Sequence, residues 1–215
     1  MRLYHYLEAK WALDDIRKRR LRVSTIDDLN DPYEFACIRS THETSQRALD
    51  AFASGHIADY RVQCFSRCWN NILMWSHYAE KHKGICLGFD VPDECTRDVT
   101  YVAEVMLIGK LTVAQGNEND EILERLIWAK YDAWSYEQEV RATGRRINMY
   151  EEGENCFVAF GEHLKLREVI LGARFSEDRE VIEEALGDYS EHVAIIKAVR
   201  SNSQFEIVFS DTGLN

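Results

Sequence analysis

The sequence predicts an α+β fold, with mixed or antiparallel sheets split around a central cleft and helices on the outside. Segments of helical and of strand-like hydrophobic periodicity follow one another irregularly, unlike the regular alternation of a doubly wound parallel sheet. Strand-like segments also stand near both ends of the chain. The 215 residues contain only two prolines and 11 glycines, with no linker among them. We therefore expect residues 1–215 to form one domain.

The first half of the chain mixes strand-like and helical segments. Residues 7–20 place Trp11, Leu13 and Ile16 among charged side chains, which is typical of an amphipathic helix. The Asp- and Asn-rich segment 27–32 predicts a turn, because these side chains satisfy local backbone donors. Further strands are expected at residues 3–6, 21–25, 62–66 and 84–89, and further helices at residues 43–60 and 73–81.

The second half is richer in strands. Residues 119–134 carry an apolar stripe that includes Leu123 and Leu126, which predicts a long helix. Another helix is expected at residues 176–186. Strands are expected at residues 99–107, 136–143, 156–160, 168–171, 192–199 and 205–209, the last two forming a hairpin.

The chain is acidic, with 37 Asp and Glu against 26 Lys and Arg and a formal net charge of −11. Overall attraction to nucleic acid or to an anionic membrane is therefore not expected, although a local basic groove stays open. No stretch reaches the roughly 18 apolar residues that span a bilayer. The first residues lack a signal-peptide core, and the six cysteines lack zinc-site spacing. We expect a cytoplasmic protein with reduced thiols, no metal and no membrane partner.

Residues 134–141 carry the sharpest chemical signal. As a strand, this segment would place Glu137, Glu139 and Arg141 on one face, with the carboxylates about 6.5–7 Å apart. Two carboxylates beside an arginine can polarise sugar hydroxyls and stabilise a cationic oxocarbenium centre. A solvent-facing strand with a surface ion pair, worth about 0–1 kcal/mol, explains the same pattern, and spacing alone favours that interpretation.

Two other segments combine aromatic and histidine side chains. Trp75, Tyr78 and His82 recur at helical spacing, which is more typical of a core stripe than of a ligand wall. His5 stands between two tyrosines on the first expected strand, where a structural role is more common than ligand binding. The chain has no Gly-rich phosphate loop and no GxSxG elbow.

Taken together, six segments resemble the bacterial domain-of-unknown-function family 2971, up to about Gly172. They are residues 3–6, 30–34, 64–66, 73–79, 83–89 and 134–141. A more distant resemblance, carried by the Tyr-His strand, helix and second strand of residues 3–25, is to the ADP-ribosyltransferase superfamily, particularly its DarT-like and RNA phosphotransferase-like branches.

The distant resemblance implies NAD as substrate, with cleavage of the nicotinamide–ribose bond and transfer of ADP-ribose to a nucleic acid or protein in a defence or toxin context. It implies that Glu139 stabilises the developing cation and that Glu137 orients or deprotonates the acceptor. The residues expected to bind NAD are His5, Arg2, Tyr78, Tyr33, Trp75, Arg141 and Ser66. The alternative is a non-catalytic module that binds a nucleotide or a protein.

Overall fold

The computed structural model describes residues 1–57, 60–109, 117–145 and 149–210. Its strands are β1 (Arg2–Leu7), β2 (Arg20–Val23), β3 (Ile38–Ser40), β4 (Tyr60–Ser66), β5 (Ile85–Asp90), β6 (Arg97–Asp98), β7 (Thr100–Val102), β8 (Met106–Ile108), β9 (Ala129–Tyr131), β10 (Glu139–Arg145), β11 (Tyr150–Glu152), β12 (Asn155–Ala159), β13 (Lys165–Leu171), β14 (Ala194–Arg200) and β15 (Ile207–Phe209). The α-helices are α1 (Ala9–Lys18), α2 (Glu43–Ile57), α3 (Ile72–Tyr78), α4 (Asn117–Trp128) and α5 (Arg179–Leu186), and the 3-10 turns used below are η1 (Ile26–Asp28), η2 (Glu80–His82) and η4 (Asp132–Glu137). Within the described residues, no helix is long and apolar enough to cross a membrane.

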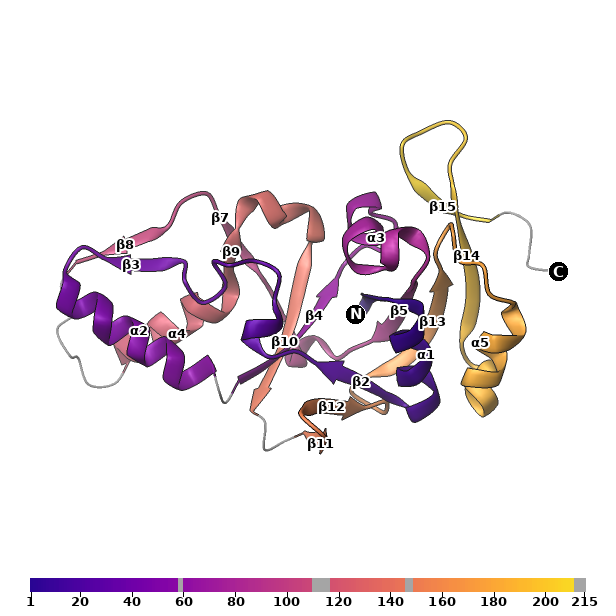
Figure 1. The fold of residues 1–215 in the computed structure, drawn as a ribbon, viewed down its shortest axis with the longest axis horizontal. Coiled ribbons are helices and arrows are strands. Elements are labelled where there is room, and N and C mark those ends of the chain that lie inside the picture. The colour runs from indigo at the N-terminus through magenta and orange to yellow at the C-terminus, as the bar shows by residue number, and fades with distance from the viewer. Residues whose placement is uncertain (58–59, 110–116, 146–148, 211–215) are drawn as a thin grey trace.

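The main sheet has the strand order β15-β14-β13-β5-β1-β4-β10-β6, and smaller sheets pair β11-β12-β2, β3-β8 and β7-β9. Parallel pairs join β13 to β14, β3 to β8 and β7 to β9, while the other pairs are antiparallel. Figure 1 shows α1, α3 and α5 around one end of the molecule and α2 and α4 at the other. The architecture is therefore mixed α+β with several separate sheets, which confirms the predicted class.

Helix α1 forms one side of the main core. Its periodicity buries Ala12, Leu13 and Ile16, which pack in one cluster with residues of β5, β13 and α5. The helix ends at Arg19, whose left-handed backbone (φ 53°) turns the chain into β2. The helix and strand predicted here are confirmed, because one face of each is apolar at the correct period.

Helix α3 covers the opposite face of the sheet. The side chain of Asn71 caps it by accepting hydrogen bonds from the backbone N–H groups of Leu73 and Met74. Met74 and Trp75 then pack in one apolar cluster with Tyr6 of β1. This packing places the helix against β1.

The main sheet is divided between β1 and β4. Strand β1 pairs with β5 along its whole length, from Arg2↔Asp90 to Leu7↔Ile85. It meets β4 at the single pair Tyr4↔Ser66, while β4 continues along β10 from Glu139↔Ser66 to Arg145↔Tyr60. The sheet therefore consists of two halves joined at one point, which we call the seam.

Several element boundaries differ from the prediction. The helix expected at 119–134 ends at Trp128, and the expected strand at 99–107 is divided into β7 and β8. Strand β9 takes the place of the last helical turns because it pairs with β7, and β8 pairs with β3. These partners lie far apart in the sequence, so local periodicity does not reveal them.

Gly172 lies where β13 ends beside η2. An added Cβ atom would lie 2.2 Å from the backbone oxygen of His82. We expect Gly172→Ala to lower the free energy of unfolding by about 2–3 kcal/mol, because backbone must move to make room. Gly161→Ala is the control, since an added Cβ there has no atom within 4 Å, and it should change stability by less than about 0.5 kcal/mol. Urea unfolding measures both; equal midpoints would contradict the prediction.

Candidate functional site

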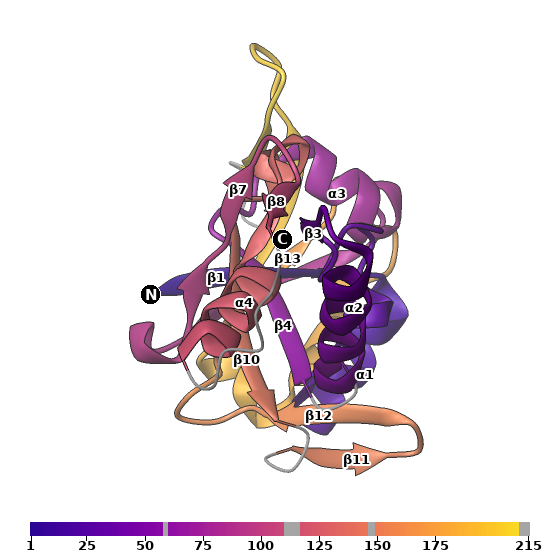
Figure 2. The same cartoon turned by 90° about the vertical axis from the view of Figure 1, so that its left-hand side faces the viewer.

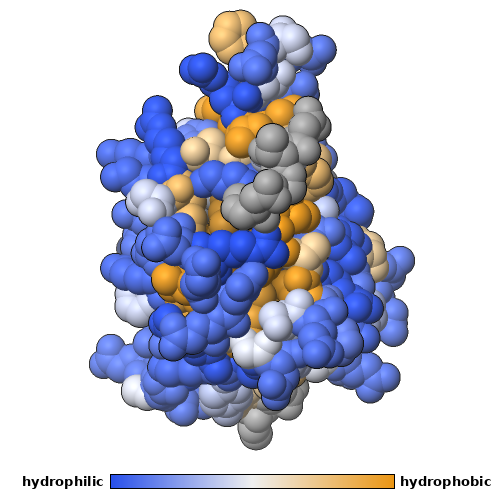
Figure 3. Space-filling view, turned by 90° about the vertical axis from the view of Figure 1, so that its right-hand side faces the viewer, coloured by the Kyte–Doolittle hydropathy of each residue, from blue (hydrophilic) through white to orange (hydrophobic). Residues whose placement is uncertain are grey.

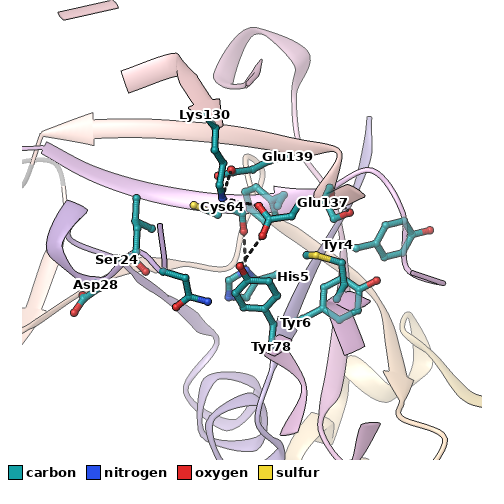
Figure 4. Close-up of a pocket in the computed structure, with 15 residues that line it drawn as sticks. Tyr4, His5, Tyr6, Ser24, Asp28, Cys64, Tyr78, Lys130, Glu137 and Glu139 are labelled. Atoms are coloured by element: carbon teal, nitrogen blue, oxygen red, sulfur yellow. Dashed lines mark hydrogen bonds and ion pairs between the residues drawn. The ribbon is translucent and has the colours of Figure 1, made fainter. Parts of the chain in front are cut away.

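A cavity of about 190 Å³ opens beside the seam. Its walls come from β1, β4 and α3, from the turn that contains η1, and from the segment of β9, η4 and β10. Five of the residues predicted from the sequence line it, and Figure 4 labels four of them: His5, Tyr78, Glu137 and Glu139, with Ser66 as the fifth. Segments more than 130 residues apart thus meet at one small cavity, and the functional roles of these residues stay predictions.

Lys130 joins the two carboxylates at the cavity. Its Nζ donates to Glu137 Oε2 at 2.6 Å and to Glu139 Oε2 at 3.1 Å (Figure 4). The side chain of Lys130 is only 7% exposed. Burial favours the neutral amine, but the charges of Glu139, Glu137 and Glu34 outweigh it and raise the pKa of Lys130. The residue therefore remains a cation.

Arg141 holds Glu139 from the other side. It is fully buried and donates from Nε to Glu139 Oε1 at 2.7 Å and from Nη2 to Glu34 Oε1 at 2.7 Å. Burial alone would raise the pKa of Glu139, but the charges of Arg141 and Lys130 lower it to about 2. Glu139 is thus a fixed negative charge. We call Glu34, Lys130, Glu137, Glu139 and Arg141 the ion cluster.

Glu34 is the least stabilised carboxylate of the ion cluster. Its Oε2 atom is buried and has no hydrogen-bond partner among the described residues. Burial raises the pKa of this carboxyl group, although the charges of Arg141 and Lys130 oppose the change. Three carboxylates therefore share two cations, and the cluster carries one excess negative charge when all five groups are ionised.

Glu137 reaches the cavity from a turn and not from a strand, which corrects the prediction that residues 136–143 form one strand. Residues Asp132–Glu137 form η4, and the left-handed backbone of Gln138 (φ 45°) redirects the chain into β10. The turn is held in place because Ser66 Oγ donates to the backbone oxygen of Glu137 at 2.6 Å. The two carboxylates meet at Lys130, which donates to both, and do not alternate along a strand as predicted.

Tyr78, the last residue of α3, closes the cavity opposite Glu137. Its hydroxyl donates to Glu137 Oε1 at 2.6 Å, as the dashed line in Figure 4 shows. Burial first, and then the charge of Glu137, raise the pKa of Tyr78, so the phenol keeps its proton. Each oxygen of Glu137 therefore has one donor, Tyr78 on one side and Lys130 on the other.

His5 lies in the seam itself. Its Nδ1 donates to the backbone oxygen of Cys64 at 2.8 Å, and burial lowers its pKa to about 4. The ring is therefore neutral at pH 7, with its proton on Nδ1 and an unprotonated Nε2 available as an acceptor. Such a nitrogen can accept a hydrogen bond from a sugar hydroxyl.

Four residues expected to bind NAD lie elsewhere. Trp75 is fully buried and donates its indole N–H to the backbone oxygen of Trp69, so it belongs to the core. Arg141 is fully buried in the ion cluster and is not open to a phosphate. Arg2 forms ion pairs with Asp90 and Glu168. Tyr33 is half exposed and lines a different hollow. Neither Arg2 nor Tyr33 lines the cavity.

Comparison with known proteins identifies one family. Residues 74–142 match the family described as Protein of unknown function (DUF2971). This confirms the predicted family resemblance over that segment, which contains Tyr78 and every member of the ion cluster except Glu34. No curated protein and no solved structure matches the chain.

Lys130 and Glu34 are the functional-site residues that the sequence analysis missed. Lys130 was placed within the expected helix 119–134, where a lysine usually faces solvent. Glu34 follows the predicted turn at residues 27–32, and turn chemistry does not require it. The sequence analysis favoured a solvent-facing strand for Glu137 and Glu139, and their burial is what requires partners of opposite sign. Among the described residues, no group of three or more His, Cys, Asp or Glu side chains is placed to hold a metal.

Replacing Lys130 should destabilise the folded protein, because the buried carboxylates lose a cation. We expect Lys130→Met to lower the free energy of unfolding by about 3–5 kcal/mol at pH 7, because it leaves buried negative charge without its partner. The loss should shrink as the pH falls below 5, because protons can then neutralise the carboxylates. The control is Lys18→Met, an exposed lysine paired with Asp14 and Glu152, which should change stability far less because solvent screens its ion pairs. Urea unfolding of both variants at several pH values measures the difference. A similar loss in the free energy of unfolding for both variants would contradict the role of Lys130.

His5 should make folding sensitive to acid. Its pKa is about 4 in the folded state and about 6.5 in an unfolded chain, so only the unfolded chain takes up this proton between those values. Stability is therefore lost as the pH falls from about 6.5 to 4, by up to about 3 kcal/mol. His5→Gln should remove this part of the pH dependence, whereas His163→Gln, at an exposed position, should keep it. Thermal midpoints across this range test the difference, and unchanged profiles for His5→Gln would refute the assignment.

Proposed function

We propose that this protein is an NAD-dependent ADP-ribosyltransferase-like enzyme. It would cleave the nicotinamide–ribose bond and transfer ADP-ribose to a nucleic acid or protein in a defence or toxin context. The observation that carries the proposal is the pair Glu137 and Glu139, which face one small cavity from a cluster with one excess negative charge. An oxidised nicotinamide ring carries a positive charge, and its departure moves that charge to the ribose. A fixed negative charge stabilises both states, and most strongly in a water-poor cavity.

The groups at the cavity support a defined order of events. The C1′–N bond breaks with its electron pair leaving on nicotinamide, and Glu139 stabilises the ribose cation that remains. The oxygen of an acceptor hydroxyl or of water then bonds to C1′, and its proton passes to Glu137. Tyr78 offers a ring face for the nicotinamide, and His5 Nε2 accepts a hydrogen bond from a ribose hydroxyl.

The division of the main sheet supports an ADP-ribosyltransferase-like fold. The cavity lies where β1 leaves β4, and β1 carries the Tyr-His sequence from which the resemblance was inferred.

The size of the cavity limits how much of NAD it can hold. At about 190 Å³ it is smaller than the 300–1,000 Å³ of typical small-molecule pockets. It would therefore hold the nicotinamide end of NAD, with the rest of the dinucleotide outside.

One observation favours the alternative, a non-catalytic binding module. Lys130 is the one cation among the described residues that line the cavity, and it is already paired with Glu137 and Glu139. Arg2 and Arg141, the two arginines expected to bind NAD, are paired with carboxylates as well. A module of this kind would bind a nucleotide or a protein without cleaving NAD.

Nicotinamide release from NAD separates the two functions. The wild-type protein should release nicotinamide, and Glu139→Gln should reduce the rate by roughly a hundred- to a thousandfold. Because Glu139 is buried, this variant will also be less stable, so thermal midpoints are needed. Glu34→Gln is the comparison within the ion cluster: it also removes the excess negative charge but leaves the wall of the cavity unchanged, so it separates the total charge of the cluster from the position of Glu139. It should reduce the rate less than about tenfold. Binding of NAD without release by the wild type would establish the module instead.

A further inference from the structure

A second hollow, of about 770 Å³, lies on the other side of α3. It is bounded by α3, by the turn after β13, and by the hairpin of β14 and β15. Figures 1 and 2 show this hairpin projecting beyond the body of the protein. Ile72 at the start of α3 lines this hollow, whereas Tyr78 at the end of the same helix lines the cavity. We call the second hollow the hairpin groove.

The hairpin groove is locally basic although the chain has a net charge of −11. Arg174 and Arg200 line it, both are exposed, and neither forms an ion pair within the described residues. Nearby, Lys197 donates only to the backbone oxygens of Gly172 and Phe175. Among the described residues of the groove wall, Glu206 supplies the one carboxylate. Lys197 does not line the groove itself, so two cations of the described groove wall stand against one anion.

A histidine in the groove reports the same local potential. His82 lines the hollow beside Arg174. Its pKa is lowered by burial and also by the charge of Arg174. The positive charge of Arg174 therefore acts on the groove wall, where His82 Nε2 lies 3.1 Å from Ser76 Oγ.

The tip of the hairpin adds an aromatic ring. Phe205 is fully exposed, while its neighbours Ser201, Asn202 and Gln204 supply hydroxyl and amide groups to the groove wall. Figure 3 shows the face that bears the hairpin, with the polar tip raised above apolar side chains. Unpaired arginines below an exposed aromatic ring match the pattern by which proteins hold single strands, with charge for phosphates and a ring for the bases.

We propose that the hairpin groove binds single-stranded nucleic acid. Arg174 and Arg200 would contact the backbone phosphates, and Phe205 would stack on a base. An acidic peptide could pair with the arginines, but it would leave the exposed ring without a partner. Binding does not depend on the proposed NAD chemistry; only the further step, in which the bound strand is the acceptor of ADP-ribose across α3, rests on it.

Fluorescence anisotropy without NAD tests the binding. The probe is a labelled oligothymidylate of about 10 nucleotides, titrated between about 50 and 200 mM salt. Arg174→Ala and Arg200→Ala should each weaken binding and reduce the slope of log K against log salt by about 1. Phe205→Ala should weaken binding by roughly five- to a hundredfold. The matched control is Arg39→Ala, an exposed arginine in β3 at the opposite end of the molecule, without an ion pair among the described residues.

Three results would overturn the inference. They are the absence of salt-dependent binding by the wild type, an equal loss on Arg39→Ala, and displacement of the probe by polyglutamate as effectively as by unlabelled oligothymidylate. Every substituted residue is on the surface, so the variants should stay folded. Their thermal midpoints check this. Since no NAD is present, each result leaves the proposed NAD cleavage to its own test.

Discussion

The site depends on two buried cations that hold three buried carboxylates. Lys130 and Arg141 come from β9 and β10, and their partners come from the turn before β3, from η4 and from β10 itself. Burying five charged groups is costly, and apolar side chains of similar volume often give equal or greater stability. The cluster is therefore poorly explained as a device for stability alone. Its distinctive product is permanent negative charge at the wall of a small cavity, and that is the property on which the proposed chemistry depends.

At the seam beside the cavity, the side chain of His5 takes the place of a backbone donor and pairs with the backbone oxygen of Cys64. Where β1 separates from β4, the two strands stop pairing after Tyr4↔Ser66. The backbone oxygen of Cys64 would be left without a donor on that side, and His5 Nδ1 supplies one. The imidazole thus allows the sheet to divide without the penalty of a buried unpaired carbonyl. The same bond fixes the tautomer of His5, so the fold determines which ring nitrogen a ligand meets.

The sequence allowed much of this arrangement to be predicted, though partly through incorrect local geometry. Periodicity predicted α1, and a continuous apolar run between glycines predicted β5, which is buried at five consecutive positions. It failed at β9, which forms only because β7 lies beside it, and it therefore concealed Lys130. The aromatic stripe of α3 was treated as one face, yet Trp75 turns into the core and Tyr78 into the cavity. A helix packed against a divided sheet can face an apolar core with one aromatic residue and a charged cavity with another, and sequence spacing alone does not separate the two.

Helix α3 has environments of opposite charge on its two sides. Toward the cavity stands the excess negative charge of the ion cluster, and toward the hairpin groove stand Arg174 and Arg200. A strand of nucleic acid is repelled by the first and attracted by the second, whereas a cationic nicotinamide ring is attracted by the first. A net charge of −11 hides this contrast, because it averages over the whole surface. Under both proposals, α3 lies between the anionic backbone of a bound strand and the carboxylates of the ion cluster. The group of the strand that reaches the ribose would then be an extended and uncharged one.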